Sequence, residues 1–456
     1  MKPNIFRDIL LTLFSSILFI LTSYGLGFLI WIAFVPLIIA FNNNKNKFRL
    51  AIFFPILFGL TAAPFFYNVV IDEAFTFLIG SIVYVIFFFF MIFLVSFILF
   101  KRISNYLEVF ITPLVFIVLF IIMGYTKYGN FIINLAVIEP SLNLLLKFIG
   151  VYGLNFLIVL FNSVIAFYII RKNKPLIIPI IIVLVILIIN SLYQPTIISD
   201  KEINIALVQG NLPFSWEWRH DNSNYIFEVY RNLTLDALKF KPKIIIWPEY
   251  TLIGDFNYKK LEKLSQEANA TIIVGIANYL NGKNFKDSAL VISKDSILMH
   301  NATYVFPSLQ EYAVASNEKP HTYNIENLNF GILICAEEAS HLGVNYGEQN
   351  ADFIVSISNN QHFNDRGLKM LSGFTRMVSS QISKYTIRAT NNGITQVIDS
   401  NGNVIKSLEP NKRGYLIATI STNNEKTFYS EYGNFPLYLI LVILFTLIIK
   451  EIMKNS

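Results

Sequence analysis

Long uncharged stretches dominate the N-terminal part of the chain and return once near its C-terminus. They cover residues 9–41, 50–71, 75–100, 109–126, 148–170, 175–199 and 432–449. A helix needs about 20 mostly apolar residues to cross a bilayer, so 9–41 holds two helices, separated at Tyr24-Gly25-Leu26-Gly27. No polar cleavage region follows the first helix, which indicates a retained span rather than a signal peptide. The pattern predicts seven transmembrane helices in residues 1–199 and an eighth in 432–456.

The basic residues between these stretches predict how the helices are oriented, because cytoplasmic loops carry an excess of Lys and Arg. With the N-terminus in the cytoplasm, the cytoplasmic segments hold Lys2, Arg7, Lys45, Lys47, Arg49, Lys101, Arg102, Arg171, Lys172, Lys174, Lys450 and Lys454. The opposite loops hold only two basic residues, Lys127 and Lys147. We therefore expect both termini in the cytoplasm and residues 200–431 on the outer face, which is the periplasm in a cell with two membranes.

Residues 200–431 have a different pattern, in which short apolar stretches alternate with polar, helix-compatible ones. A helix is predicted near 220–240, and strands at Ile203–Val208, Ile244–Trp247, Thr271–Gly275, Leu290–Ser293, Phe330–Ile334, Phe353–Ser358, Ile387–Thr390, Gln396–Asp399 and Tyr415–Ile420. Strands that alternate with helices are typical of layered α/β domains. The sequence thus predicts an α/β domain tethered to the membrane at both ends.

The composition supports the membrane interpretation. The chain is 54% hydrophobic and 14% charged, whereas ordinary globular chains are about 25% charged. Its formal net charge is +6, but the basic residues form short clusters between apolar runs rather than the stripe that binds phosphates. We therefore expect membrane lipids, and no nucleic acid, among its partners.

One apolar run ends at a candidate nucleophile. Phe330–Ile334 leads directly into Cys335, with Glu337 close behind, and α/β enzymes commonly keep their reactive groups at the C-terminal ends of strands. Cys335 is the only cysteine of the chain, so it forms no disulfide within it. A single cysteine is more often a small buried hydrophobic residue than a nucleophile. To act near neutral pH it needs a base or a positive neighbour.

Two acidic residues are candidate partners for this thiol. Glu249 follows Ile244–Trp247 and Pro248, and a proline is expected to end the strand there. A carboxylate partly buried beside Trp247 would have a raised pKa, which suits a general base. The alternative is a solvated loop residue. Glu311 is a weaker candidate of the same kind.

The sequence gives no positive indication of a cofactor. The histidines show no metal-ligand spacing, and one cysteine is too few for a structural zinc site; they are His220, His300, His321, His341 and His362. A glycine-rich phosphate loop is absent, as is the G-x-S-x-G motif of serine hydrolases. We expect neither metal nor cofactor.

Five segments resemble known families. Four of them resemble the first strand, the Glu motif, the Cys motif and a late motif of the nitrilase, or carbon–nitrogen hydrolase, superfamily: Ile205–Asn211, Trp247–Glu249, Ile334–Glu337 and Arg388–Ile394. Gly150–Leu157 is similar to the sixth span of the apolipoprotein N-acyltransferase family, in which seven spans precede such a domain and one follows it. The resemblance covers nearly the whole chain.

The resemblance implies a membrane bundle at 1–199, an αββα catalytic domain at 200–431, and a last span with a cytoplasmic tail at 432–456. It implies that Cys335 is the nucleophile, Glu249 the general base, and Glu311 and Glu337 accessory acids. It fails at the family's catalytic Lys, because Ala302 occupies that position, five residues before Pro307. The nearest candidate cations are Lys294, His300 and Lys319.

The family chemistry implied by this resemblance is acyl transfer by a monomeric enzyme of the inner membrane. A phospholipid would acylate Cys335, and the N-terminal amine of a diacylglyceryl-modified apolipoprotein would accept the chain. Two alternatives stay open. The first is a membrane-tethered amidase that uses the same residues with water as acceptor. The second is a catalytically silent homologue that binds lipoproteins or lipids, which Ala302 favours.

Overall fold

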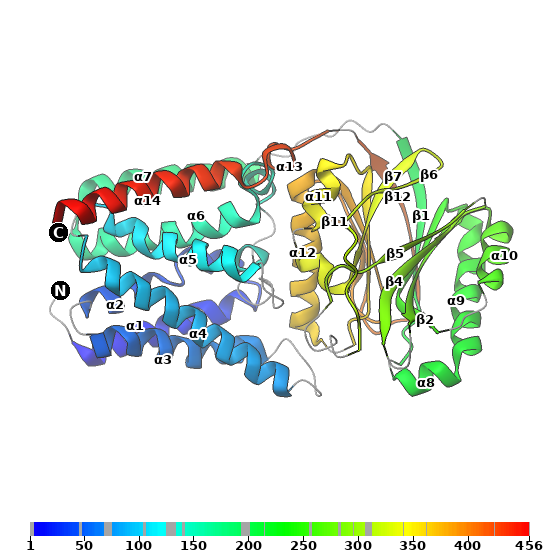
Figure 1. Ribbon diagram of the computed structural model, residues 1–456, viewed down its shortest axis with the longest axis horizontal. Coiled ribbons are helices and arrows are strands. Elements are labelled where there is room, and N and C mark those ends of the chain that lie inside the picture. The colour runs from blue at the N-terminus through cyan, green and yellow to red at the C-terminus, as the bar shows by residue number, and fades with distance from the viewer. Residues whose placement is uncertain are drawn as a thin grey trace. The chain divides into compact units, whose positions relative to one another are not determined.

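The computed structural model describes residues 4–44, 48–67, 75–103, 106–124, 134–138, 142–192, 201–213, 215–254, 258–280, 284–294, 296–305, 312–340, 342–361, 363–423 and 425–455. The chain divides into two compact units (Figure 1). One is helical and comprises Met1–Tyr193 and Tyr432–Ser456, and the other comprises Gln194–Glu431.

The first unit is built from long apolar helices. They are α1 (Ile5–Thr22), α2 (Val35–Asn43), α3 (Phe48–Tyr67), α4 (Phe75–Phe100), α5 (Glu108–Gly124), α6 (Asn143–Arg171), α7 (Ile177–Leu192) and α14 (Phe435–Asn455), with short 3₁₀ turns at Gly27–Trp31, Leu135–Ile138 and Lys174–Leu176. Between α1 and α2 the chain turns through Gly25, whose φ of +90° favours glycine.

Five described stretches are long and apolar enough to cross a membrane: Ile5–Thr22, Ile82–Phe100, Asn143–Arg171, Lys174–Leu192 and Phe435–Lys454. Three shorter apolar stretches, Gly27–Asn43, Ile52–Ala62 and Glu108–Gly124, coincide with the other predicted spans. The chain is therefore a multi-pass membrane protein, and the total of eight spans stays a prediction.

Buried polar side chains link these helices. Asn162 of α6 donates to the Ile30 carbonyl at 3.0 Å and accepts from the Phe34 N–H at 2.9 Å. Glu108 and Arg171 connect the start of α5 to the end of α6 through an ion pair of 2.5 Å. In hydrocarbon such contacts satisfy groups that would otherwise have no partner.

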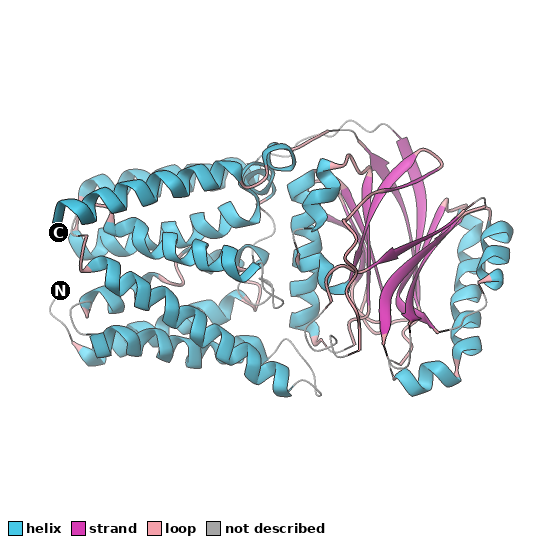
Figure 2. Ribbon diagram, in the orientation of Figure 1, coloured by secondary structure: helices cyan, strands magenta, loops and turns pink. Residues whose placement is uncertain are grey.

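The second unit is a sandwich of two six-stranded mixed sheets (Figure 2). The first has the order β12-β1-β2-β3-β4-β5 and the second β11-β10-β9-β8-β7-β6. Their bounds are β1 (Lys201–Gln209), β2 (Ile244–Ile253), β3 (Thr271–Tyr279), β4 (Phe285–Ile292), β5 (Ile297–Asn301), β6 (Tyr323–Ile325), β7 (Leu328–Ile334), β8 (Phe353–Ser358), β9 (Tyr385–Thr390), β10 (Thr395–Ile398), β11 (Val404–Leu408) and β12 (Gly414–Thr422). In each sheet three parallel strands, β1–β3 and β7–β9, are flanked by antiparallel ones.

Helices cover the outer face of each sheet, which gives four layers. The helices of this unit are α8 (Trp216–Asp221), α9 (Ser223–Ala237), α10 (Lys259–Ala268), α11 (Leu342–Glu348), α12 (Asp365–Ile382) and α13 (Phe428–Tyr432), with 3₁₀ turns at Leu238–Phe240 and Cys335–Ala339. Here α9 and α10 pack on the first sheet, and α11 and α12 on the second. Ile246 and Ile332 belong to the core between the sheets, while Trp247 packs under α9.

The predicted layered α/β domain is thus confirmed, but several strands differ from the prediction. The strand predicted at Leu290–Ser293 begins earlier, at Phe285, and β5, β6 and β11 were not predicted. Pro248 was expected to end its strand, and that is wrong: pairing of β2 with β3 resumes at Leu252.

Candidate active site

A bulge in the middle of β2 carries Glu249. Trp247 pairs with Val274 and Leu252 with Ile276, so four residues of β2 face the single residue Gly275 of β3. Such a bulge bends the strand and redirects its side chains. Tyr250 within it has a φ of +52°. An ideal Cβ on Gly275 would lie 2.4 Å from the Glu249 Cα, so the bulge needs glycine beneath it.

Replacing Gly275 with alanine is expected to displace Glu249, because the new methyl group also meets the Pro248 carbonyl oxygen at 2.5 Å. We expect stability to fall by about 1–3 kcal/mol and activity by about 10²-fold. Gly414→Ala is the matched control in the same sheet, since its Cβ meets only Leu408 Cδ2, at 3.8 Å. Equal activities and thermal midpoints in the two variants would contradict this role of the bulge.

Cys335 is the first residue after β7 and begins the 3₁₀ turn Cys335–Ala339. Its φ of +47° lies in the left-handed region, which non-glycine residues rarely adopt and which is common at functional sites. The side chain is half-buried. The neighbouring parallel strand β8 ends at Ser358, so Asn359 follows it at the same edge of the sheet.

Glu249 reaches from the first sheet to this edge of the second. Its Oε2 accepts from the Asn359 backbone N–H at 2.5 Å, and the Cys335 thiol lies close enough for each group to shift the pKa of the other. The side chain is 1% exposed. Burial raises the pKa of Glu249 to about 7, and the nearby Asp287 and Cys335 side chains, together with the Asn359 N–H, hold back a larger rise.

A second buried acid, which the sequence interpretation missed, lies near Glu249. Asp287, in β4, is 4% exposed, and its Oδ2 accepts from the Tyr250 hydroxyl at 2.8 Å. Burial raises the pKa of Asp287 well above its usual range, and the charge of Glu249 raises it further. The residue lay in a polar stretch before the predicted strand, so hydrophobic patterning gave no signal for it.

The thiol therefore lies in an acidic environment. Burial raises the pKa of Cys335 well above its usual range, and the nearby carboxylates of Glu249, Asp287 and Glu338 raise it further. A preformed thiolate is unfavourable here, because it would be one more negative charge in a buried cluster. Attack by the sulfur thus requires that its proton is transferred in the same step.

The remaining sequence candidates have other surroundings. Glu337 accepts from the Thr303 N–H at 2.7 Å and the Ile334 N–H at 2.9 Å, so it holds the turn that carries the thiol. Ala302 is buried, and its N–H donates to the Asp287 carbonyl at 2.8 Å. Glu311 lies outside the described residues.

The three candidate cations also differ in their surroundings. His300 is buried between the Tyr323 hydroxyl, at 3.2 Å, and Glu337 Oε2, at 3.5 Å. Lys294 and Lys319 are exposed. The charged groups that act most strongly on Cys335 are all acidic.

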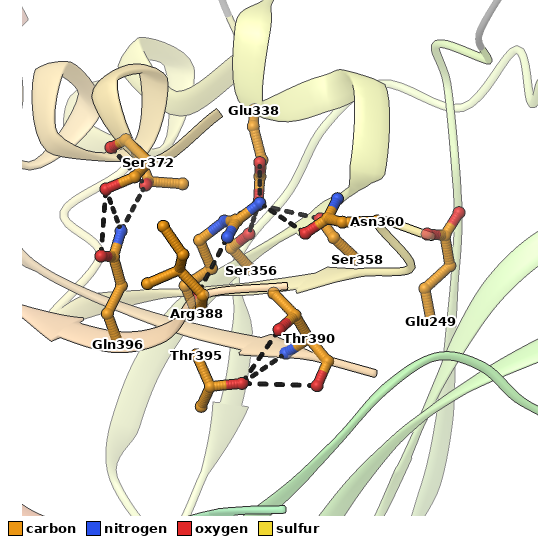
Figure 3. A network of polar contacts seen from close by, with 12 residues as sticks. Glu249, Glu338, Ser356, Ser358, Asn360, Ser372, Arg388, Thr390, Thr395 and Gln396 are labelled. Carbon is orange, nitrogen blue, oxygen red and sulfur yellow. Dashed lines mark hydrogen bonds and ion pairs between the residues drawn. The ribbon is translucent and has the colours of Figure 1, made fainter. Parts of the chain in front are cut away.

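A buried ion pair fixes the other end of the turn (Figure 3). Arg388 donates through Nε to Glu338 Oε1 at 2.9 Å and through Nη2 to Glu338 Oε2 at 3.2 Å. The same Nη2 donates to Asn360 Oδ1 at 3.0 Å, and the hydroxyls of Ser356 and Ser358 donate to Glu338. These contacts hold the turn after β7 against the ends of β8 and β9.

Replacing Glu338 with glutamine is expected to destabilise the protein by about 3–5 kcal/mol, because Arg388 would remain as a buried charge without its counterion. Glu409→Gln is the control: Glu409 forms an ion pair with Lys412 on the exposed surface, where such pairs contribute little. The thermal unfolding midpoint measures the stability of both variants. A midpoint of Glu338→Gln equal to that of the control would contradict the structural role of the buried pair.

Two family models match successive parts of the chain. Residues 15–164 match the apolipoprotein N-acyltransferase N-terminal domain, and residues 204–427 match the carbon–nitrogen hydrolase family. The second match contains Glu249, Asp287, Cys335 and Arg388. The helical unit and the sandwich thus each carry a match of their own.

Curated relatives match the chain at low identity. An apolipoprotein N-acyltransferase of Photobacterium profundum is 26% identical over 66% of this chain and 65% of its own length. One of Borreliella burgdorferi is 26% identical over 67% of this chain and 68% of its own. An amidase of the nitrilase superfamily from Nesterenkonia is 11% identical, with a TM-score of 0.43 over 54% of this chain and 99% of its own. The chain thus spans just under two thirds of the Photobacterium relative.

Proposed function

The chain belongs to the apolipoprotein N-acyltransferase family, and on that premise we propose that it transfers an acyl chain from a phospholipid to the N-terminal amine of a diacylglyceryl-modified apolipoprotein. The proximity of Glu249 to Cys335, in a chain whose membrane part matches the same family, carries this assignment. Both substrates are lipid-anchored, which agrees with a catalytic unit attached to a membrane bundle.

In the first half-reaction, Glu249 accepts the thiol proton while the sulfur of Cys335 attacks the ester carbonyl of the phospholipid. A carbon–sulfur bond forms, and the carbon–oxygen bond to the lysophospholipid breaks. The departing oxygen takes the proton back from Glu249. A thioester remains on Cys335.

In the second half-reaction, the α-amine of the lipoprotein attacks the thioester. The amine loses a proton to Glu249, the carbon–sulfur bond breaks, and the sulfur takes up a proton to restore the thiol. The Asn359 N–H holds the Glu249 carboxylate at 2.5 Å in both half-reactions. Glu249 thereby acts alternately as base and acid.

The proposal includes the membrane topology expected from the charge distribution. Eight spans place both termini in the cytoplasm and the sandwich on the periplasmic face of an inner membrane. Diacylglyceryl-modified lipoproteins would then meet the enzyme on the side where their lipid-modified N-termini lie.

The test is transfer by the purified full-length protein, with a phospholipid labelled in its acyl chain and a peptide that begins with diacylglyceryl-cysteine. The proposal expects an amide-linked label on the peptide. Hydrolysis of soluble amides without transfer would favour the tethered amidase. Neither activity, in protein shown to be folded, would leave the silent homologue, for which Ala302 stands in the position of the family lysine.

A further inference from the structure

Two buried carboxyl groups, those of Glu249 and Asp287, lie near each other and near the thiol. Tyr250, the next residue after Glu249, donates to Asp287 Oδ2 at 2.8 Å, and the two acids are 1% and 4% exposed. Two buried carboxylates so close together cannot both carry a full charge at neutral pH. The pocket therefore needs either a cation or a proton.

The hydrogen bonds of the two groups show where a proton fits. One oxygen of each has a donor: Glu249 Oε2 has the Asn359 N–H, and Asp287 Oδ2 has the Tyr250 hydroxyl. The other two oxygens, Glu249 Oε1 and Asp287 Oδ1, are buried and receive no N–H or O–H donor from the described residues. A hydrogen carried by one of these oxygens and donated to the other would satisfy both. Without that hydrogen both oxygens are acceptors, and two acceptors cannot form a hydrogen bond with each other.

We propose that Glu249 and Asp287 share one proton in the resting protein, so that the two acids together carry one negative charge. Asp287 is then a positioning residue for the general base. This inference rests on the proposed function for its catalytic meaning. Ala302, which stands where the family lysine is expected, donates its N–H to the Asp287 carbonyl at 2.8 Å and brings no charge to the acids. The shared proton would neutralise half of the acid pair, which leaves one charge to accept the thiol proton.

The other charged and titratable groups around the pair are few. Tyr250 donates to Asp287, Cys335 lies near both acids, Glu337 and Glu338 belong to the turn that begins at Cys335, and Arg219 donates to the Tyr250 carbonyl at 2.5 Å. Glu337 is held by backbone donors and Glu338 by Arg388. Protons that move during the reaction are therefore assigned to the pair and the thiol.

The proton count closes over each half-reaction. The pair begins with one proton and the sulfur with one. As the sulfur attacks, its proton passes to the pair, which then holds two and is neutral. The leaving oxygen of the lysophospholipid removes one proton, and the shared proton remains. In the second half-reaction the attacking amine gives the pair a proton and the departing sulfur removes one, so the shared proton remains again.

The test compares Asp287→Asn and Asp287→Ala in the full-length protein, by the pH dependence of thioester formation on Cys335. The amide of Asp287→Asn can donate to Glu249 Oε1 and accept from the Tyr250 hydroxyl, so the rise in rate with pH is expected within about half a pH unit of its wild-type position. Asp287→Ala removes the donor, so the rise is expected about one pH unit or more higher.

Two results would overturn the proposal. If Asp287 is ionised, Asp287→Asn removes a like charge and moves the rise about one pH unit or more lower. If neither variant shifts the pH at which the rate of thioester formation rises, Asp287 does not act on Glu249. Should Asp287→Ala fail to fold, Asp287→Asn alone still distinguishes a shared proton from an ionised residue.

A readout without turnover separates this proposal from the proposed function. A protonated carboxyl group gives an infrared carbonyl band, which the wild type should retain at about pH 8 and Asp287→Asn should lose. If Asp287→Asn loses the band while the wild type forms no thioester, the shared proton is supported and the acyl transfer is rejected. An unchanged band would reject the shared proton, whatever the activity.

Discussion

Replacing Cys335 with alanine is expected to abolish acyl transfer, by at least about 10⁴-fold, the order observed when a catalytic nucleophile is removed. Cys335 is the only cysteine of the chain, so no other thiol can form the thioester. The measurement is the transfer of labelled acyl chains from phospholipid to a diacylglyceryl-cysteine peptide.

The fold is expected to survive this change. Both cysteine and alanine carry a Cβ, so the φ of +47° is equally strained in the two proteins. The thermal midpoint of Cys335→Ala should therefore lie close to the wild-type value. Transfer at an undiminished rate by the folded variant would contradict a covalent mechanism and favour a binding role.

Replacing Glu249 with glutamine is expected to slow transfer by about 10²–10⁴-fold, the contribution of a positioned general base. Glutamine keeps the shape and can still accept from the Asn359 N–H. It removes the charge that raises the pKa of the thiol, so the pKa of Cys335 should fall while catalysis is lost. The rate at which a thiol-specific alkylating reagent modifies the protein, followed as a function of pH, measures this pKa at a single site because the chain has one cysteine.

Glu249→Gln is expected to make the thiol more acidic and yet to slow the transfer. This combination distinguishes a general base from a residue with only a structural role. A base is required for attack even when the thiol becomes more acidic. A variant with a lower thiol pKa and faster transfer would contradict the assignment of Glu249 as general base. Asp287→Asn is the comparison, since it retains Glu249 itself.

The same substitution is expected to stabilise the protein at high pH. Unfolded, Glu249 titrates near 4.5, and folded it titrates at about 7. Between these values the folded state holds a proton that the unfolded state has lost, so stability falls as pH rises. Above pH 7 the cost is about 3 kcal/mol. Thermal midpoints should favour Glu249→Gln at about pH 8 and show no such gain at about pH 4.

Hydrophobic patterning singled out the two central residues of the candidate site for one physical reason. Cys335 follows a buried strand directly, and Glu249 lies just beyond the apolar stretch Ile244–Trp247. Apolar β-branched runs are visible in a single sequence, and chemistry concentrates where such runs end. The geometry that brings the two together, from different sheets, required the fold.

Other features had no local signal. Asp287 lies near the polar start of β4, before the stretch that was predicted as a strand. The partner of Arg388 is Glu338, fifty residues away, and only the packing of β7, β8 and β9 brings them together. The bulge over Gly275 was missed because Pro248 normally ends a strand, whereas here β2 continues past it.

The most direct test of the whole account is a thioester on Cys335 in the absence of any acceptor. Full-length protein is incubated with phospholipid labelled in the acyl chain, next to Cys335→Ala and Glu249→Gln. We expect label on the wild-type protein that neutral hydroxylamine releases, with none on Cys335→Ala and slow labelling of Glu249→Gln. A folded wild-type protein that acquires no label would contradict acyl transfer and mark Ala302 as the site of a lost activity.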